Sequence, residues 1–474
     1  MWEAYYSVST LSEALSLLNE YQDRARIVAG GTDLILELER GQRPTVSTII
    51  DITRVKGLDQ ITLHGETIRL GALVTHNHVV SSDLILSRAL PLAQASWEVG
   101  APQIRNRATI AGNIITASPA NDTITPLMAL SAEVTLASVD GERTIALNDF
   151  YAGFRQTVMR PNEMLTAISF PAFAENERGV FMKLGLRRAQ AISVVDVAIV
   201  VGMDANLTVT SARITMGSVA PTIIHAPVAE NALIGRQLTS ETISEVAHLA
   251  SLTPSPIDDV RSTADYRTEM IKVLVARALR RLAQDKVETG IPVNPPMLWG
   301  DHKATVIDGL SEQIKHSAVT PIETTINGKA VSINSGHHKS LLHWLREDAK
   351  LLGTKEGCAE GECGACTIFL DGAAVMACMV HAPRAHHAEI MTVEGLKQDE
   401  MLHPIQNAFI EEAAVQCGYC TPGFLMSGAK LLEEIEHPNR EQINYSISGN
   451  LCRCTGYYKI VKAFEEASKA KNKS

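Results

Sequence analysis

Over about the first 170 residues, short apolar stretches follow a helical period and a strand-like period in alternation. Thr10 and Glu13 form a capping box that opens a helix. Strand patterns follow at Arg26–Ala29 and Ile49–Ile52, and a further helical pattern lies between them at Leu34–Arg40. This alternation predicts a mixed domain of helices and strands.

The pattern changes in the middle of the chain. Two long apolar runs, Ile192–Met203 and Leu207–Met216, are typical of neighbouring strands in one sheet. The stretch Ala264–Lys286 has apolar residues along one stripe, which predicts a long amphipathic helix. Together these patterns predict a second part of the same mixed class.

A proline-rich stretch comes next. Ile291–Pro296 cannot form a regular helix or a central strand, because its prolines lack the backbone N–H. The residues from there to Thr320 are mixed and polar, so we predict a linker over residues 289–320.

Turn signals mark the following segment. The dipeptides at residues 327–328 and 371–372, Asn-Gly and Asp-Gly, each lie between two apolar runs and predict β-hairpins. A helix is predicted between the hairpins at Ser340–Asp348. Two hairpins packed on one helix suggest a small α+β domain of the β-grasp type.

The pattern is helical after His403. Thr421 precedes Pro422 and is predicted to be the N-cap of a helix, and Thr455 is predicted to cap the final one. We therefore expect a small helical bundle at the end of this sequence.

Composition narrows the function classes. The sequence has 474 residues, which suggests roughly three domains of ~150 residues each. The formal net charge is −10, and no basic stripe of the kind that binds nucleic acid occurs. No apolar run is long enough to span a bilayer, and residues 1–5 lack the pattern of a signal peptide, so we expect a cytoplasmic protein. The 15 histidines show no helical ligand spacing, and most of them are expected in solvated loops.

All eight cysteines fall in the last quarter of the sequence, in two sets of four with different spacings. The first set reads C-x4-C-x2-C-x11-C and consists of Cys358, Cys363, Cys366 and Cys378. The second reads C-x2-C-x31-C-x-C and consists of Cys417, Cys420, Cys452 and Cys454. Because the first spacing is the plant-type pattern that binds a [2Fe–2S] cluster, the two sets predict two metal centres.

Disulfides and zinc are the alternatives. A disulfide framework is usual in short secreted chains, which this sequence does not resemble. Zinc sites prefer paired knuckles of similar spacing, whereas here only the second and third cysteines of the first set and the first two of the second set form such pairs. Glycines at positions 357, 361 and 364 also permit the close backbone approach that a two-iron cluster needs.

Two glycine loops in the first half are candidates for nucleotide binding. They are Val28–Asp33 and Thr109–Asn113, the second followed by Ser118–Asp122. Glycine lets backbone N–H groups approach a pyrophosphate, although neither loop has the G-x-G-x-x-G fingerprint and either could be an ordinary turn. Asp33 and Asp122 could equally be helix caps.

At these residues the chain resembles the flavin and iron–sulfur portions of the xanthine dehydrogenase family of molybdenum hydroxylases. That family includes xanthine dehydrogenases, aldehyde oxidases and aerobic carbon monoxide dehydrogenases. The segments similar to its FAD-binding signature are Ala29–Leu34, Gln103–Asn106, Thr109–Thr116 and Ser118–Asp122. Those similar to its two cluster signatures are Gly357–Thr367, Gln416–Gly423 and Asn450–Tyr457.

The resemblance implies a set of cofactor-binding residues. For FAD these are Arg26, Ile27, Val28, Ala29, Gly30, Gly31, Thr32, Asp33, Leu34, Ala108, Thr109, Gly112, Asn113, Ile115 and Asp122, with Leu165 and Lys183 near the flavin ring. The first cysteine set would hold the cluster nearer the flavin, and the second set the cluster nearer a molybdenum cofactor. Gln416 and Cys454 would face the pterin of that cofactor.

The fold implied is an α+β multidomain protein. Its expected parts are a two-part FAD-binding domain of the vanillyl-alcohol-oxidase (PCMH-like) type at residues 1–175, a C-terminal α/β subdomain at 176–288, the linker at 289–320, a plant-ferredoxin-like β-grasp [2Fe–2S] domain at 321–397 and a four-helix [2Fe–2S] domain at 398–474. Two departures from the family bear on flavin binding. Ala111 replaces a usual glycine, and Glu98 follows Trp97 where eukaryotic xanthine enzymes have an aromatic residue.

The function implied is electron transfer in an oxidoreductase. No acid–base arrangement rises above chance, so no catalytic residue is predicted. We recognise no molybdenum-binding domain, so electrons would pass from a molybdopterin cofactor on a separate large subunit through two [2Fe–2S] clusters to FAD, and then to an acceptor such as NAD+. A dimer of heterodimers is also implied.

Other interpretations stay open from the sequence. A stand-alone FAD and iron–sulfur reductase is one, although Gln416 and Asn450–Tyr457 would have no role in it. The partner's substrate could be a purine, an aldehyde, an N-heterocycle or carbon monoxide, and the stretch Asn113–Asp122 favours a purine.

Overall fold

The computed structural model describes residues 2–284, 287–300, 310–317, 319–397 and 401–470. Part of the predicted linker, at residues 301–309 and 318, and the predicted end of the long helix, at residues 285–286, lie outside the described residues. The chain forms two compact units, neither of which is continuous in sequence. Unit 1 comprises Met1–Lys56, Gly100–Ala108 and Pro292–Ser474, and unit 2 comprises Gly57–Val99 and Thr109–Ile291.

Unit 1 begins with a four-stranded sheet in the order β15-β1-β3-β2. Its elements are β1 (Ala4–Ser7), α1 (Leu11–Tyr21), β2 (Ala25–Val28), α2 (Leu34–Glu39), β3 (Thr48–Asp51) and β15 (Ile314–His316). The predicted capping box at the start of α1 is confirmed, because Thr10 accepts from the N–H of Glu13 and the Glu13 side chain accepts from the N–H of Thr10. β1, β3 and β2 are parallel, which requires the helices α1 and α2 as connections.

Two segments of the predicted linker, residues 297–300 and 314–316, are bonded to other parts of unit 1, so the prediction of a linker is wrong for them. β15 pairs antiparallel with β1, so residues 314–316 complete the N-terminal sheet. The backbone N–H groups of Met297, Leu298, Trp299 and Gly300 all donate to the carboxylate of Glu434, over 2.6 to 3.2 Å. Both partners come from segments more than a hundred residues away, so local polarity gave no sign of them.

A five-stranded sheet follows in the order β17-β16-β20-β18-β19. Its strands are β16 (Ile322–Ile326), β17 (Lys329–Ile333), β18 (Thr367–Leu370), β19 (Ala373–Met376) and β20 (Glu389–Met391), and α13 (Leu341–Glu347) packs against it. Both predicted hairpins are confirmed. The sequence missed β20, a three-residue strand that lies parallel to β16 and antiparallel to β18 and so joins the hairpins.

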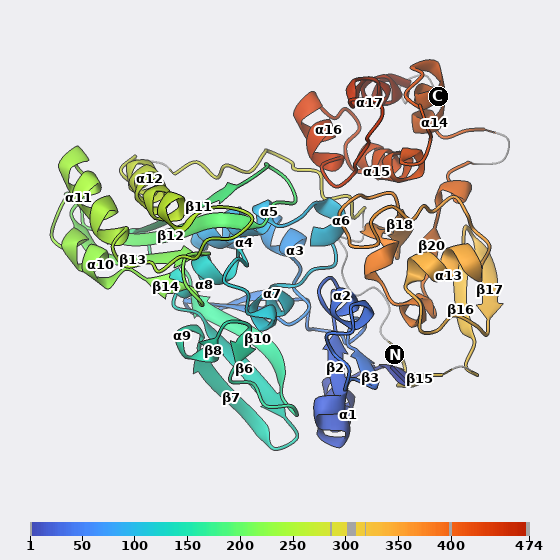
Figure 1. Cartoon of the computed structure of the whole chain (residues 1–474), viewed down its shortest axis with the longest axis horizontal. Helices are drawn as coiled ribbons and strands as arrows, with labels where there is room; N and C mark the ends of the chain where they lie inside the picture. Colours follow the sequence, from blue (N-terminus) through green and yellow to red (C-terminus); the bar gives the residue numbers. More distant parts are fainter. Residues whose placement is uncertain (1, 285–286, 301–309, 318, 398–400, 471–474) are drawn as a thin grey trace. The chain divides into compact units, whose positions relative to one another are not determined.

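The C-terminal part of unit 1 contains the helices α14 (Pro404–Glu411), α15 (Thr421–Glu434), α16 (Arg440–Ser446) and α17 (Tyr458–Ala470). Figure 1 shows these helices gathered together. Their apolar faces share one buried core, which includes Phe424, Phe464 and Ile405. The prediction that Thr421 is an N-cap is wrong. The N-cap of α15 is Cys420, and Thr421 is already the first helical residue.

Unit 2 contains a five-stranded sheet in the order β4-β5-β10-β6-β7. Its strands are β4 (Ile61–His64), β5 (Thr67–Gly71), β6 (Glu133–Ser138), β7 (Gly141–Ala146) and β10 (Met164–Pro171), all antiparallel to their neighbours. The remaining elements of this part are α3 (His76–Val80), α4 (Asp83–Arg88), α5 (Leu90–Glu98), α7 (Ile110–Thr116), α8 (Ile124–Ala129), α9 (Leu147–Phe150), β8 (Tyr151–Gly153) and β9 (Gln156–Thr157).

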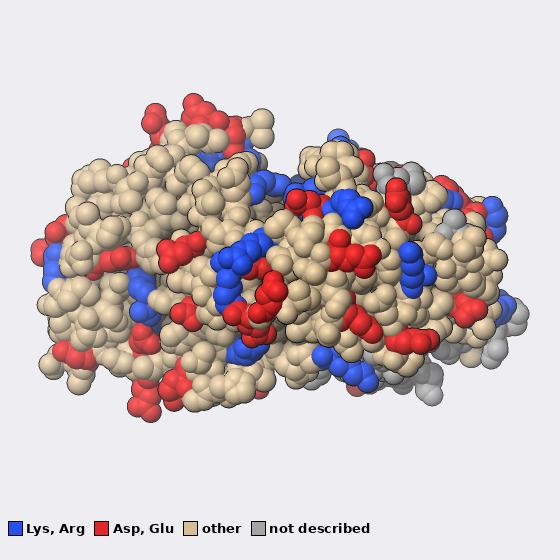
Figure 2. Space-filling view, turned by 90° about the horizontal axis from the view of Figure 1, so that it is seen from below, with Lys and Arg blue, Asp and Glu red and all other residues tan. Residues whose placement is uncertain are grey.

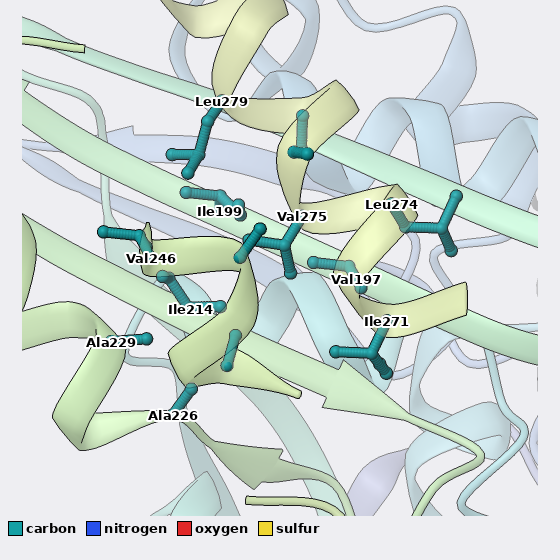
Figure 3. Close-up of a cluster of buried hydrophobic side chains, with 14 of the residues drawn as sticks. Val197, Ile199, Ile214, Ala226, Ala229, Val246, Ile271, Leu274, Val275 and Leu279 are labelled. Carbon is teal, nitrogen blue, oxygen red and sulfur yellow. The ribbon is translucent and has the colours of Figure 1, made fainter. Parts of the chain in front are cut away.

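A second sheet of unit 2 has the order β11-β12-β13-β14. It consists of β11 (Glu177–Gly185), β12 (Ser193–Met203), β13 (Val209–Gly217) and β14 (Ile224–His225), with α10 (Pro227–Leu233), α11 (Ser240–Ala250) and α12 (Ala264–Leu282) packed on it. The predicted pairing of the two long apolar runs is confirmed as β12 with β13. Figure 3 shows how Ile271, Val275 and Leu279 of α12 meet Val197 and Ile199 of β12 in the buried core.

Among the described residues, no helix is long and apolar enough to cross a membrane. On the face in Figure 2, acidic and basic side chains are interspersed in small groups. The bounds of the five parts drawn from the sequence stay predictions.

The core of the second sheet predicts a stability difference between two isoleucines of one segment. Ile199 is fully buried, so Ile199→Ala should lower the free energy of unfolding by about 2–5 kcal/mol through lost burial and a residual cavity. Ile192 is 63% exposed, so Ile192→Ala should change it by less than about 0.5 kcal/mol. Urea unfolding followed by circular dichroism measures both. Equal losses in the two variants would contradict this description of the core.

Candidate functional site

The first cysteine set lies around β18 and β19. Cys358, Cys363 and Cys366 occupy the loop before β18, and Cys378 lies in the short 3-10 helix after β19. The sulfurs of Cys366 and Cys378 are 3.4 Å apart. Two thiolates on one tetrahedral metal lie roughly 3.7 Å apart when each metal–sulfur bond is about 2.3 Å. The cysteines that the chain separates by eleven residues are therefore brought to the spacing of two ligands on one metal.

Cys358 and Cys363 form the other pair of this set. The backbone N–H groups of Glu360 and Glu362 donate to the Cys358 sulfur over 3.3 and 3.2 Å. The neighbouring Cys363 thiol and these N–H groups lower the pKa of Cys358 to about 5. A sulfur that is stabilised as thiolate in this way is suited to binding metal.

Glycine is needed beside this loop for space. A Cβ on Gly357 would lie 2.5 Å from the Cys363 sulfur. Gly364 has a φ of +67°, and a Cβ there would lie 2.3 Å from the carbonyl oxygen of Gly449. Gly364 therefore permits the close backbone approach predicted for it, and Gly357 leaves room for the Cys363 sulfur.

The second cysteine set lies at helix ends of the four-helix part. Cys417 and Cys420 precede α15, and Cys452 and Cys454 lie in the segment from α16 to α17. The neighbouring Cys417 thiol raises the pKa of Cys454, and burial together with the Cys452 thiol raises the pKa of Cys420. This set is therefore also arranged as two pairs.

Thr455 forms hydrogen bonds to a cysteine sulfur and does not cap the last helix. Its N–H and its hydroxyl both donate to the Cys452 sulfur, over 3.4 and 3.1 Å. Its hydroxyl oxygen accepts from the N–H of Tyr457, one residue before α17 begins. The predicted capping role of Thr455 is thus wrong, and the residue stabilises a thiolate of the second set.

The arrangement as pairs distinguishes a two-metal cluster from a single ion. All eight cysteines are free thiols, so no disulfide forms. Within the described ranges, no three of the sulfurs lie within 4.8 Å of one another. Four thiolates around one zinc ion would all be mutual neighbours at about 3.7 Å. Two thiolates on each of two irons match the observed pairs better.

The two cysteine sets are joined by one backbone hydrogen bond. The N–H of Leu451, which precedes Cys452, donates to the carbonyl oxygen of Cys363 over 2.9 Å. A Cβ on Gly423 at the start of α15 would lie 2.1 Å from the carbonyl oxygen of Gly364. The two loops are therefore in direct backbone contact.

The predicted FAD residues Arg26–Leu34 and Ala108 belong to unit 1. β2 ends at Val28, and the turn at Gly30 and Gly31 leads into α2. Among the described residues, the N–H groups of Gly30, Gly31 and Thr32 donate to no acceptor. Three consecutive unpaired N–H groups suit a pyrophosphate, so the loop fits the group predicted for it.

Gly30 has a second reason to be glycine that the sequence did not show. A Cβ at Gly30 would lie 2.4 Å from the carbonyl oxygen of Arg107, whose guanidinium also donates to the carbonyl of Ala29 over 3.1 Å. The segment that contains Arg107 therefore crosses the loop closely.

The predicted FAD residues from Thr109 onward belong to unit 2. Thr109 is the N-cap of α7 and accepts from the N–H of Gly112 over 2.9 Å. Asn113 accepts from Thr123 through its side chain and from Asn121 through its carbonyl, both over 2.6 Å. These bonds make the loop after α7 a defined structure, with Ile115 41% exposed beside it.

Asp122 is an ion-pair partner and not a helix cap. Its carboxylate accepts from Lys183 and from Ser193, each over 2.6 Å, and the pair with Lys183 is buried. Lys183 also donates to the backbone carbonyl of Glu98 over 3.2 Å. The departure at Glu98 thus leaves this lysine contact intact, because only the backbone of that residue takes part.

Three further residues named from the sequence are two buried apolar side chains and one exposed glutamine. Leu165 is 1% exposed in β10, against which α7 packs. Ala111 is 4% exposed within α7. Gln416 is exposed beside Cys417 in unit 1.

Asp196 was missed by the sequence analysis. It is fully buried in the middle of β12, where Thr125 donates to one carboxylate oxygen over 2.5 Å and the other oxygen has no partner among the described residues. Burial and the charge of Asp122 raise the pKa of Asp196 to about 8. The signal in the sequence was an acidic residue inside an otherwise apolar strand.

Four domain models match the chain. They are the FAD binding domain in molybdopterin dehydrogenase (residues 2–173), the CO dehydrogenase flavoprotein C-terminal domain (181–282), the 2Fe-2S iron-sulfur cluster binding domain (324–389) and a [2Fe-2S] binding domain (392–465). The chain thus has an FAD-binding part and two [2Fe–2S] domains in this order.

Two relatives match different parts of the chain. The nicotinate dehydrogenase small FeS subunit of Eubacterium barkeri is 47% identical over 146 residues, which are 31% of this chain and 93% of that subunit. The carbon monoxide dehydrogenase medium chain of Hydrogenophaga pseudoflava is 32% identical over 276 residues, which are 58% of this chain and 95% of that one.

A solved structure matches the flavin part. It is the carbon monoxide dehydrogenase from Hydrogenophaga pseudoflava that lacks the Mo-pyranopterin moiety of the molybdenum cofactor. The match has a TM-score of 0.56 and 32% sequence identity, and covers 59% of this chain and 96% of that chain.

The cysteine pairs predict how iron content responds to ligand loss. Cys366→Ser should remove the first cluster and Cys417→Ser the second, so each should lower iron from about four to about two atoms per chain. Iron analysis and electron paramagnetic resonance of the reduced variants should show different remaining signals. Retention of full iron content in either variant, or loss of the same signal in both, would contradict the assignment of the two sets.

The buried carboxyl of Asp196 predicts a pH dependence of stability. Native protein keeps a proton there that the unfolded chain releases above about pH 4, because the native pKa is raised to about 8. This group therefore makes the free energy of unfolding fall as the pH rises from about 4 to 8. Asp196→Asn should remove that fall, whereas Asp140→Asn at an exposed hairpin should not. Urea unfolding at several pH values tests it, and parallel profiles for the three proteins would contradict it.

Proposed function

Because this chain belongs to the molybdenum hydroxylase family as a fused FAD and iron–sulfur chain, we propose that it is the electron-transfer subunit of a molybdenum-containing dehydrogenase. Its partner is a separate large subunit that holds the molybdopterin cofactor and oxidises the substrate. When bound, the clusters supply one-electron transfer, and the flavin supplies storage of two electrons for an acceptor such as NAD+.

The observation that carries this proposal is the direct backbone contact of the two cysteine loops. The backbone N–H of Leu451 donates directly to the backbone carbonyl of Cys363. The backbone segments that carry the two sets are therefore linked by a single hydrogen bond, with no side chain between them. The glycines at this contact allow the approach, and a larger residue there would separate the loops. The chain's own role is thus to fix the two clusters at a short, constant separation.

The second set is also open to a partner. Cys417 and Cys454 are both exposed, whereas Cys366 and Cys378 are buried. Along the chain beside the two exposed cysteines lie the exposed apolar residues Val415, Tyr419, Leu451 and Tyr458. Exposed apolar side chains grouped in this way are typical of a protein–protein interface.

The cofactor residues named from the family signatures remain part of this proposal. We propose that the FAD-binding residues are Arg26–Leu34, Ala108, Thr109, Gly112, Asn113, Ile115 and Asp122, with Leu165 and Lys183 near the flavin ring. Within unit 2, Asp122 would fix the Lys183 ammonium near the flavin, since the two form a buried ion pair. Gln416 and Cys454 would face the pterin.

The location, the oligomeric state, the electron acceptor and the substrate also remain proposals. The assembly would be a cytoplasmic dimer of heterodimers with NAD+ as acceptor. The stretch Asn113–Asp122 would favour a purine substrate of the xanthine type, whereas the relatives named for nicotinate and carbon monoxide favour those substrates. Turnover by the native complex with each compound in turn decides among them.

Copurification tests the partner directly. The chain purified from its native cells should bring down a larger protein that contains molybdenum. Tyr458→Asp places a charge on the proposed interface and should lower recovery of that protein at least tenfold, since burial of an unpaired charge is costly. Tyr266→Asp is the control, because Tyr266 is also exposed in the first turn of a helix. Recovery of the chain with its cofactors but without a molybdenum protein would contradict the proposal.

A further inference from the structure

Three arginines from three separate segments of unit 1 are buried or partly buried, Arg54 fully and Arg107 and Arg384 in part. Arg54 follows β3 and is 8% exposed, Arg107 follows α6 (Pro102–Arg105), and Arg384 lies in a short 3-10 helix with its side chain 10% exposed. Burial and the charge of Arg384 lower the pKa of both Arg54 and Arg107 to about 10. The Arg384 guanidinium is therefore close enough to each of the other two to repel it.

Many of their N–H groups have no acceptor. Arg384 donates to Asp371 over 2.7 Å, but its Nε and Nη1 have no partner among the described residues. Arg107 donates to Ala29, but its Nε is likewise without a partner. In the part of the chain that the structure describes, Arg54 forms no hydrogen bond or ion pair. Buried charged donors without acceptors are costly, and such groups mark the place of a bound water or ion.

The nearby carboxylates do not complete the cluster. Asp51 is 3% exposed, and its two oxygens accept from the Tyr5 hydroxyl and the N–H of Thr53, over 2.6 and 2.8 Å. Asp371 accepts from Arg384 and from the N–H of Glu389. Each carboxylate is thus already hydrogen-bonded by other groups, and neither pairs with Arg54 or Arg107.

The charges in the cluster also do not balance. Burial lowers the pKa of His381 to about 4 and raises that of Tyr5, so both are uncharged at neutral pH. Three guanidinium groups and two carboxylates then leave one positive charge inside the protein. Water could accept the free N–H groups but would leave this charge uncompensated, which is expensive in a buried place.

We propose that Arg54, Arg107 and Arg384 bind one monovalent inorganic anion of the halide class. A halide accepts several N–H groups at once and supplies the missing negative charge. None of the three arginines is among the residues proposed for FAD or the clusters, so this site goes beyond the proposed function. It would join the N-terminal sheet, through Arg54, to the ferredoxin-like part, through Arg384, while Arg107 also binds the carbonyl of Ala29 at the glycine loop.

Bromide is the probe for the site itself. Crystals of the full chain with its cofactors, grown in sodium bromide, should show one anomalous peak in contact with all three guanidinium groups. Ordered waters alone at this place, a phosphate of FAD there, or bromide peaks only at surface lysines and arginines would overturn the proposal.

Thermal unfolding of two variants tests the energetic role. Sodium bromide should raise the melting temperature of the wild type by about 2–4 °C relative to sodium gluconate of equal ionic strength. Arg54→Met should abolish this rise, and without halide it should melt no lower than the wild type, because it removes a buried charge and breaks no hydrogen bond. Arg440→Met is the control, since Arg440 is 63% exposed, and it should keep the full rise.

Equal bromide responses in the wild type and in Arg54→Met would overturn the proposal. If Arg54→Met does not fold, the anomalous peak in the wild type decides the matter without it.

Discussion

The relative placement of the two cysteine sets depends on the backbone contact between the two loops that carry them. Leu451 donates to the carbonyl of Cys363, and glycines at positions 364 and 423 leave no side chain to keep the two backbones apart. A protein that carries two clusters must hold them at a constant short separation, because electron transfer weakens steeply with distance. A backbone hydrogen bond beside glycine provides that separation without depending on flexible side chains.

Segments far apart in sequence stabilise this contact within unit 1. Gln103 donates to Ser427 and Asn450, each over 3.0 Å, so the short helix α6 is bonded to the helices that hold the second set. Asn106 donates to the carbonyls of Leu298 and Ala374, and Glu434 binds four consecutive N–H groups from Met297 onward. The stretch expected to be a loose linker is therefore bonded at both of these points. Deleting it should disturb the cluster-binding part, and not only its tether.

Features with local causes could be predicted from the sequence. The capping box at Thr10, the hairpins at Asn327 and Asp371 and the two cysteine sets depend on residues a few positions apart or on spacing alone. Features with distant partners could not be predicted. β15 and β20 are three-residue strands that exist because β1, β16 and β18 offer them hydrogen bonds. For the same reason the pairing of Thr125 with Asp196 and the arginine cluster had no local pattern, although a buried acid in an apolar strand was a visible anomaly.

The chain is thus best understood as a scaffold that spaces cofactors and exposes one cysteine set to a partner. The central proposal is that substrate oxidation happens on another subunit. The most direct measurement is the anaerobic visible spectrum of the isolated chain and of the native complex after addition of the substrate. Bleaching of the flavin and cluster absorption in the complex alone is the predicted result. Bleaching of the isolated chain by the same substrate would contradict the account.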